Sequence, residues 1–234
     1  MSLAMRDDTV VELMDDPACD PDRLAATLRR FGVINRLVSG WGTVYRTTLA
    51  PHLASLSRPA RVLDLGSGGG DVLLRLAALA RRDGLDVQWT GAEPDPRAHA
   101  VAAERRASVE VSFRCADAAA LVAEGRTYDA VLSNHVLHHL GEELAPFMAE
   151  SLALSSGLVL HGDIERSRFA YGLYAVGITP FAPGTFLRTD GLRSIRRSFR
   201  RAELQAVLDR SSSGAWSVQT PAPFRLLAVS RRSG

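Results

Sequence analysis

The sequence contains no lysine, so all 28 of its basic residues are arginines, against 26 acidic residues. Its two cysteines, Cys19 and Cys115, are far apart and match no metal-binding spacing. We interpret them as ordinary thiols and expect a reducing, cytoplasmic location. No apolar run approaches the roughly 20 residues that cross a bilayer, and the acidic residues 1–17 lack the order of a signal peptide. We therefore predict no membrane insertion.

The length of 234 residues allows one sizeable α/β domain with an accessory element, but not two full enzyme domains. Nothing in the sequence specifies an oligomeric state. A cluster of arginines near the C-terminus suggests a nucleic-acid groove as one interpretation. Only Phe186 and Phe199 are available there for stacking on bases, so we favour a solvated face or contacts within the fold and predict no nucleic-acid partner. The arginines of this cluster are Arg188, Arg193, Arg196, Arg197, Arg200 and Arg201.

After Pro59, short β runs alternate with helical stretches, which predicts an α/β fold with a parallel sheet covered on both faces. The last two runs are joined by a short proline-rich link, which permits only an antiparallel pair. We therefore expect a mostly parallel sheet with a reversed last strand. The predicted strands are 61–65, 87–92, 112–115, 130–133, 157–162, 216–219 and 224–230, and the predicted early helices are 71–82 and 97–106.

Two segments lie outside this alternation. Residues 1–58 read as an N-terminal helical cap, with Asp20-Pro21 as a helix start and a second helical stretch at 41–56. Residues 59–234 form the main domain, in which the aromatic-rich insertion at about 164–197 separates the fifth and sixth strands. This insertion suits a lid over an apolar substrate, and filling of the core is an equally supported alternative.

A glycine-rich loop follows the first predicted strand and precedes a helix. Its glycines allow a ligand to approach the backbone. A dinucleotide fingerprint requires Gly or Ala three positions after Gly68, where this chain has Asp71. Asp64, within the strand beneath the loop, adds a second carboxylate. Two carboxylates disfavour a pyrophosphate and suit a ligand with sulfonium and ammonium groups, such as S-adenosylmethionine.

Acidic residues also end the next two predicted strands. Glu93 can accept hydrogen bonds from both ribose hydroxyls, which supports a nucleoside without choosing the cofactor. Asp117 could accept the adenine amino group, and the backbone amide of Ala118 could contact the ring. The alternative for Asp117 is a residue of a simple turn.

The succession VLDLGSGGGD, TGAEPD, CADAA and YDAVLSNHVLHHL resembles the motifs of class I S-adenosylmethionine-dependent methyltransferases over about residues 59–160. The resemblance implies a Rossmann-like seven-stranded sheet, S-adenosyl-L-methionine as cofactor and S-adenosyl-L-homocysteine as product. It implies that the methionine part is bound by Gly66, Ser67 and Gly68, and the ribose by Glu93 with Pro94. The adenine site would be formed by Asp117 and Ala118. The position near the transferring methyl group would be formed by Asn134 and His135.

Within that superfamily the chain is similar to small-molecule methyltransferases associated with type III polyketide synthases. The similarity extends over the opening MDDPACDPDRLAATLRRFGVINRL, the segment GDIERSR and the stretch DGLRSIRRSFRRAEL. It implies secondary metabolism and a phenolic, polyketide-derived acceptor, methylated at oxygen. Alternatives are C-methylation of a quinone precursor and, from another class, a nicotinamide-dependent oxidoreductase.

Methylation of a phenol also requires a base, usually histidine. If a helix starts at the end of the fourth predicted strand, His135, His138 and His139 lie on one side of it. We favour His139 or His135 as the catalytic base, although each could instead cap the helix, pack beneath the cofactor or shape the pocket. Two of the histidines could also ligate zinc, but we identify no third ligand nearby and predict no metal site.

Overall fold

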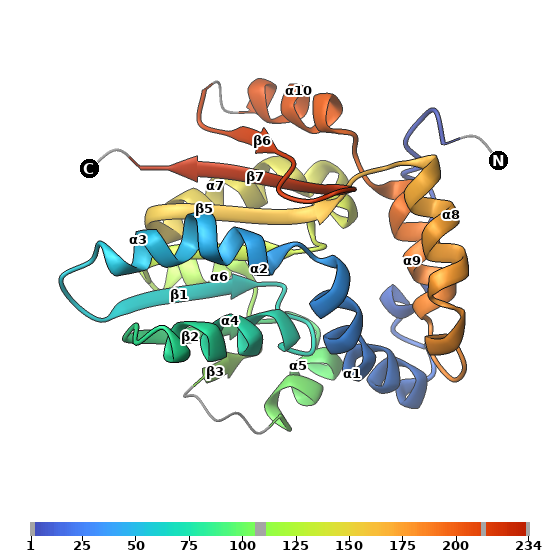
Figure 1. Ribbon diagram of the computed structural model, residues 1–234, viewed down its shortest axis with the longest axis horizontal. Helices are drawn as coiled ribbons and strands as arrows, with labels where there is room; N and C mark the ends of the chain where they lie inside the picture. The colour runs from blue at the N-terminus through green and yellow to red at the C-terminus, as the bar shows by residue number, and fades with distance from the viewer. Residues whose placement is uncertain (1–2, 106–110, 212–213, 233–234) are drawn as a thin grey trace.

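The computed structural model describes residues 3–105, 111–211 and 214–232, and its centre is a seven-stranded sheet (Figure 1). The spatial order is β3-β2-β1-β4-β5-β7-β6, and β7 alone runs antiparallel to its neighbours. This arrangement confirms the predicted mostly parallel sheet with a reversed last strand. The strands are β1 (Ala60–Leu65), β2 (Val87–Ala92), β3 (Val111–Arg114), β4 (Tyr128–Asn134), β5 (Ser155–Ile164), β6 (Ser217–Gln219) and β7 (Arg225–Arg231).

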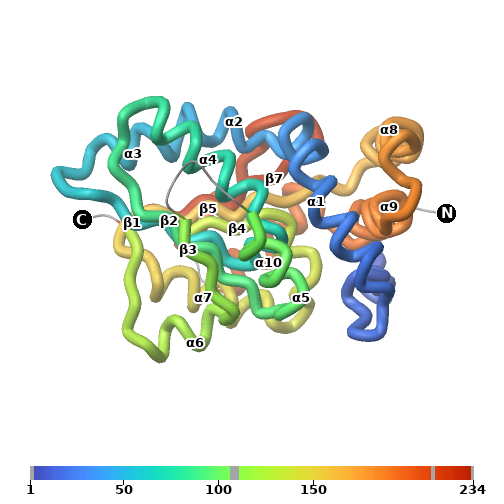
Figure 2. Tube along the Cα trace, turned by 90° about the horizontal axis from the view of Figure 1, so that it is seen from below, coloured from blue at the N-terminus to red at the C-terminus, as the bar shows by residue number. Residues whose placement is uncertain are grey.

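Helices cover both faces of the sheet, as Figures 1 and 2 show. One face packs on α2 (Trp41–Val44), a π-helical turn (Tyr45–Leu49), α3 (Ala50–Ala54) and α4 (Asp71–Arg82). The other packs on α6 (Ala118–Ala123), α7 (Leu144–Leu154) and α10 (Arg201–Ser211). The central strands are apolar on both faces because both are buried, which is the pattern of a parallel sheet.

Three further helices lie beside the carboxyl ends of the central strands (Figure 1). They are α1 (Pro21–Val38) from the N-terminal segment and α8 (Arg168–Gly177) and α9 (Leu187–Arg197) from the insertion. The Asp20 carboxylate caps α1 by accepting the amides of Asp22 and Arg23, and Pro21 occupies the first turn. Leu24 and Leu28 of α1 then pack against Phe186 and α5 (Pro96–Ala103).

Two predicted helices differ from the observed ones. The stretch 41–56 is a succession of α2, a π-helical turn and α3, whose apolar side chains, including Trp41 and Tyr45, are buried in the core. The predicted helix 97–106 is α5, which begins and ends earlier, and the end of that prediction lies outside the described residues.

Most arginines of the C-terminal cluster bind other parts of the chain. Arg196 pairs with Asp7 and Arg197 with Asp15, while Arg193 donates to a backbone carbonyl of the N-terminal segment. These contacts attach the first residues of the chain to α9. In the part of the chain that the structure describes, no helix has the length and apolar character needed to span a membrane.

Candidate active site

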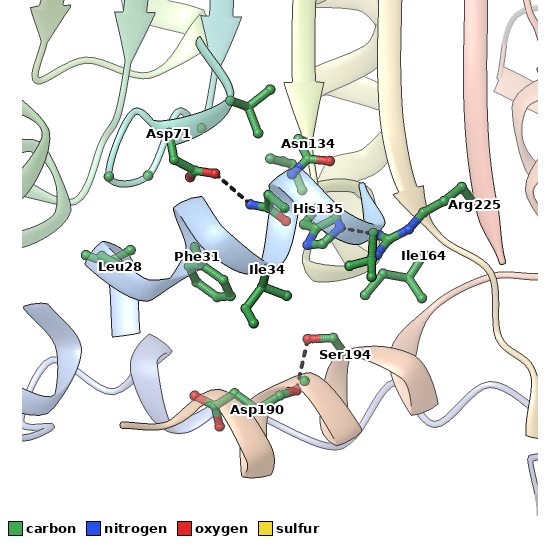
Figure 3. A pocket seen from close by; sticks show the side chains of 18 of the residues that line it. Leu28, Phe31, Ile34, Asp71, Asn134, His135, Ile164, Asp190, Ser194 and Arg225 are labelled. Atoms are coloured by element: carbon green, nitrogen blue, oxygen red, sulfur yellow. Dashed lines mark hydrogen bonds between the residues drawn. The ribbon is translucent and has the colours of Figure 1, made fainter. Parts of the chain in front are cut away.

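A cavity of about 1120 Å³ opens at the carboxyl ends of β1 and β4, between the sheet and helices α1, α8 and α9 (Figure 3). Ligands of open α/β sheets bind at this edge. A pocket for one small molecule measures roughly 300–1,000 Å³. The cavity therefore has room for a nucleoside together with a second molecule.

Most of the residues selected from the sequence meet in this cavity, although they come from three strand ends and the following loops. Asp117 and Ala118 do not line it: Asp117 is exposed and caps α6 through a 2.8 Å bond from the Ala120 amide to Oδ1. Their contact with an adenine ring stays a prediction. The predicted residues that do line the cavity are Asp64, Gly66, Ser67, Gly68, Asp71, Glu93, Pro94, Asn134, His135 and His139.

The glycine loop can adopt its conformation only because side chains are absent at particular positions. Gly66 has φ of +66°, and a Cβ there would lie 2.7 Å from Val136 Cγ2. Glu93 then fastens the loop to β2, because its Oε2 accepts the Gly68 amide at 2.8 Å while Oε1 accepts the Asp95 amide at 3.0 Å. The loop therefore passes close to the cavity with its backbone exposed to a ligand.

Three carboxyl groups, those of Asp64, Asp71 and Glu93, lie close together at this end of the cavity. Burial, followed by the charges of Asp71 and Glu93, raises the pKa of Asp64 to about 8. Burial also raises the pKa of Asp71, despite the hydrogen bond from Asn35 Nδ2 to its Oδ2 at 3.0 Å, and it raises the pKa of Glu93. The ionised forms are thus unfavourable without a compensating cation.

These features fit S-adenosylmethionine. Its ammonium and sulfonium charges compensate the carboxylates, and its ribose hydroxyls can use the free lone pairs of Glu93. Among the described residues, the Ser67 hydroxyl is buried without a hydrogen-bond partner, so it can still donate to a ligand. Ser67, Gly68 and Asp71 would hold the methionine part, with Asp64 beneath it.

The three histidines follow β4 in a different way from the one expected. The sheet hydrogen bonding continues one residue past β4, because the His135 amide donates to the Gly162 carbonyl at 2.9 Å. His135 then has φ of +62°, and a 3₁₀ turn (Leu137–His139) takes the place of the expected helix. The rings still gather, with centroids 6.4 Å apart for His135 and His138 and 4.2 Å for His138 and His139.

His135 lies next to Arg225 of β7 at the edge of the cavity (Figure 3). The Arg225 guanidinium donates to His135 Nε2 at 2.5 Å. Burial, and next the charge of Arg225, lowers the pKa of His135 well below its ordinary value. With that lone pair engaged, His135 is the weaker of the two predicted bases.

His138 and His139 instead face carboxylates. His138 Nδ1 lies 2.7 Å from Asp163 Oδ1, and His139 Nδ1 lies 3.3 Å from Asp15 Oδ2. Glu12 Oε1 lies 3.4 Å from His138 Nε2 and 3.6 Å from His139 Nε2. Burial opposes a charge on His138, but Asp163 and Glu12 outweigh it and raise the pKa of His138 to about 9.

The other end of the cavity is largely apolar. Phe31 and Ile34 of α1 point into the space between α1 and α9 (Figure 3). Tyr174 of α8, Phe181 and Phe224 complete this wall. The aromatic insertion therefore contributes to the cavity and also to the core, since Phe186 is buried against α1.

Several residues of the site gave no signal in the sequence. Glu12 and Asp15 come from the N-terminal segment, which Asp190 of α9 fastens by accepting the amides of Leu13 and Met14 at 2.8 and 3.0 Å. Arg225 begins the last strand. An isolated charged residue in such a segment has no distinguishing pattern, so only the fold reveals its neighbours.

Comparisons with known sequences agree with this geometry. Residues 62–155 match the sequence model of a family described as "Methyltransferase domain". A ubiquinone biosynthesis O-methyltransferase of Dinoroseobacter shibae is 33% identical over 121 residues, which cover 50% of this chain and 46% of that protein. The enzyme of the same name from Methylocella silvestris is 28% identical over 189 residues, 74% of this chain and 71% of that protein. The chain thus spans about half the length of several of the curated relatives that it matches.

Solved structures share the fold at low sequence identity. The plantazolicin methyltransferase BpumL, in complex with a triazolic desmethylPZN analog and SAH, has a TM-score of 0.64 at 13% identity, covering 95% of this chain and 97% of that one. Human N-acetylserotonin methyltransferase in complex with SAM has a TM-score of 0.60 at 12% identity, covering 88% and 55%. The chain therefore has the Rossmann-like fold of these methyltransferases, and its residues 62–155 match the methyltransferase domain family.

Proposed function

We propose that the protein transfers a methyl group from S-adenosylmethionine to a small aromatic acceptor, most directly at a phenolic oxygen. The carrying observation is the group of buried carboxyls at the glycine loop, Asp64 and Asp71, with Glu93 beside them. A pyrophosphate would be repelled by this group, which argues against the nicotinamide alternative.

The bound cofactor supplies an electrophilic methyl group on its sulfonium. The protein's own task is to position the acceptor and exclude water. We propose that Asn134 and His135 border the methyl group, since both lie at the end of β4 between the glycine loop and the apolar wall. Trp41 Nε1 donates to Asn134 Oδ1 at 2.9 Å, which fixes that amide.

The apolar wall supports an aromatic acceptor, and the buried Arg225 supports an acidic one. Its guanidinium can stabilise a phenolate as the oxygen loses its proton. The proton would leave on the side of His139, since His135 Nε2 is engaged by Arg225. The names of the curated relatives agree with methylation at oxygen, and C-methylation is the competing outcome.

We also propose that residues 1–58 act as a helical cap on the main domain, 59–234, and that the insertion at about 164–197 acts as a lid. Support comes from α1, α8 and α9, which border the apolar end of the cavity together.

The test is incubation with isotope-labelled S-adenosylmethionine and a panel of resorcinols, pyrones and naphthoquinones. Label in a product that strong acid cleaves indicates an O-methyl ether, whereas acid-stable label indicates a ring methyl group. Calorimetry in parallel should detect binding of S-adenosylhomocysteine. Binding of NAD in its place would refute the proposed function.

A further inference from the structure

We propose that Glu12, His138 and His139 form a binding site for one divalent transition-metal ion of the zinc type, at the acceptor end of the cavity. The nitrogen and oxygen atoms that these side chains offer all lie within 4.8 Å of one another. All three residues line the cavity. The sequence offered two histidines without a third ligand, and the fold supplies that ligand from the N-terminal segment.

The two distances from Glu12 to the histidines match tetrahedral coordination. Zinc bonds to histidine nitrogen and carboxylate oxygen are about 2.0–2.2 Å, which places neighbouring ligand atoms of a tetrahedron about 3.3–3.6 Å apart. Glu12 Oε1 lies 3.4 Å from His138 Nε2 and 3.6 Å from His139 Nε2. Two histidines and a glutamate are also a known set for zinc sites that keep one position open.

Each histidine is held by a carboxylate on its far side, and Glu12 accepts a hydrogen bond at the oxygen that faces the histidines. Asp163 Oδ1 lies 2.7 Å from His138 Nδ1, and Asp15 Oδ2 lies 3.3 Å from His139 Nδ1, so both rings direct Nε2 toward Glu12. Ser194 Oγ donates to Glu12 Oε1 at 2.6 Å. Carboxylates that orient ligating histidines in this way are the usual outer partners of metal sites.

The Nε2 atom of His138 lacks a short hydrogen bond. His138 is 1% exposed, and Glu12 Oε1, the neighbour of Nε2 in this cluster, lies 3.4 Å away. A buried polar atom with so long a contact is costly, so a closer bonding group there would stabilise it. A metal ion would supply that bond, taking the place of the proton on Nε2.

Because all three residues line the cavity, a fourth position open to it would give the ion a role. An acceptor hydroxyl bound there would lose its proton to solvent more readily, because a bound cation lowers the pKa of a coordinated oxygen. The C–S bond to the methyl group would then break as the new O–C bond forms, leaving a neutral thioether. This role rests on the proposed methyltransferase function, whereas the metal site itself does not.

Metal binding can be measured without turnover. The full-length protein, freed of metal with a chelator, is titrated with Co²⁺ as a spectroscopic probe and with Zn²⁺ against a chromophoric chelator. We expect one equivalent of Co²⁺, with the intense visible absorption of a four-coordinate ion. Replacing a ligand, as in Glu12→Gln or His138→Gln, should weaken binding by at least about 100-fold, and Asp163→Asn by about 10- to 100-fold.

His52→Gln is the matched control, because His52 Nε2 contacts the Asp129 carbonyl outside the cavity. If the variants at buried positions do not fold, His139→Gln is the ligand variant to test, since the His139 side chain is 27% exposed. No uptake of Co²⁺ or Zn²⁺ by the unaltered protein, or uptake that all these variants retain, would overturn the metal site. S-adenosylhomocysteine binding is measured on the same samples: its presence without metal uptake refutes the metal site alone, and its absence refutes the proposed function.

Discussion

Asp64→Asn is expected to stabilise the ligand-free protein at alkaline pH and to remove its affinity for S-adenosylmethionine. Asp64 is 2% exposed, and burial raises its pKa from 3.8 to about 8. Between these two values the folded chain binds the proton that the unfolded chain has lost. The carboxyl therefore costs stability progressively as the pH rises from about 4 to about 8, and it costs little below that range.

The magnitude follows from the same two pKa values. A rise from 3.8 to about 8 is equivalent to ~6 kcal/mol if nothing relaxes. Relaxation and water in the cavity should reduce the cost to ~2–3 kcal/mol. Asn has the same shape and no charge, so in a chain of this size we expect the unfolding temperature at pH 8.5 to rise by ~4–12 °C. The difference should shrink as the pH falls toward 4, where the carboxyl costs little stability.

The assay is thermal unfolding across pH, with calorimetry of cofactor binding. Asp129→Asn is a control of opposite sign, since Arg58 and the Arg61 amide outweigh burial and lower the pKa of Asp129. That variant should lose stability at pH 8.5 and keep cofactor affinity. Cofactor binding to the unaltered protein should release protons near pH 7, seen as a dependence of the heat on the buffer. An Asp64→Asn variant that is less stable at pH 8.5, or that binds the cofactor normally, would refute the reasoning.

Three further outcomes follow from the site. Glu93→Ala should weaken the binding of S-adenosylhomocysteine by at least ~10-fold, since each charge-assisted hydrogen bond contributes ~1.5–3 kcal/mol. An unchanged affinity in calorimetry would contradict the ribose role of Glu93. Gly66→Ala should lower the unfolding temperature more than Gly125→Ala, because both have φ of +66° but only the first meets a side chain, Val136; equal losses would contradict the contact. Arg225→Met should lower kcat/KM for a phenolic acceptor ~10- to 150-fold and leave the cofactor affinity unchanged. Weaker cofactor binding would instead place Arg225 at the nucleoside.

The strands and the reversal of the last one follow closely from local patterns. The predicted helix 71–82 coincides with α4, and the predicted strand 87–92 coincides with β2. Buried parallel strands need continuous apolar runs, and the short proline-rich link before β7 permits only a reversal. These constraints act between residues close in sequence, so the sequence reveals them directly.

The turn after β4 shows where local reasoning fails. The spacing of His135, His138 and His139 fits a helix, yet sheet bonding to Gly162 extends past β4 and His135 has a positive φ. A backbone conformation of this kind is imposed by tertiary contacts and not by helix propensity. The histidines still meet, but their partners are an arginine and carboxylates from distant segments.

The sequence by itself determined the nucleoside end of the site. Asp64, Gly66 and Glu93 belong to strand ends that a parallel sheet must bring to one edge, so their meeting required only the sheet. The tertiary structure decided the acceptor end. Glu12 reaches His138 because Asp190 of α9 holds the N-terminal segment, and contacts between segments so distant in sequence have no local periodicity by which the sequence could reveal them.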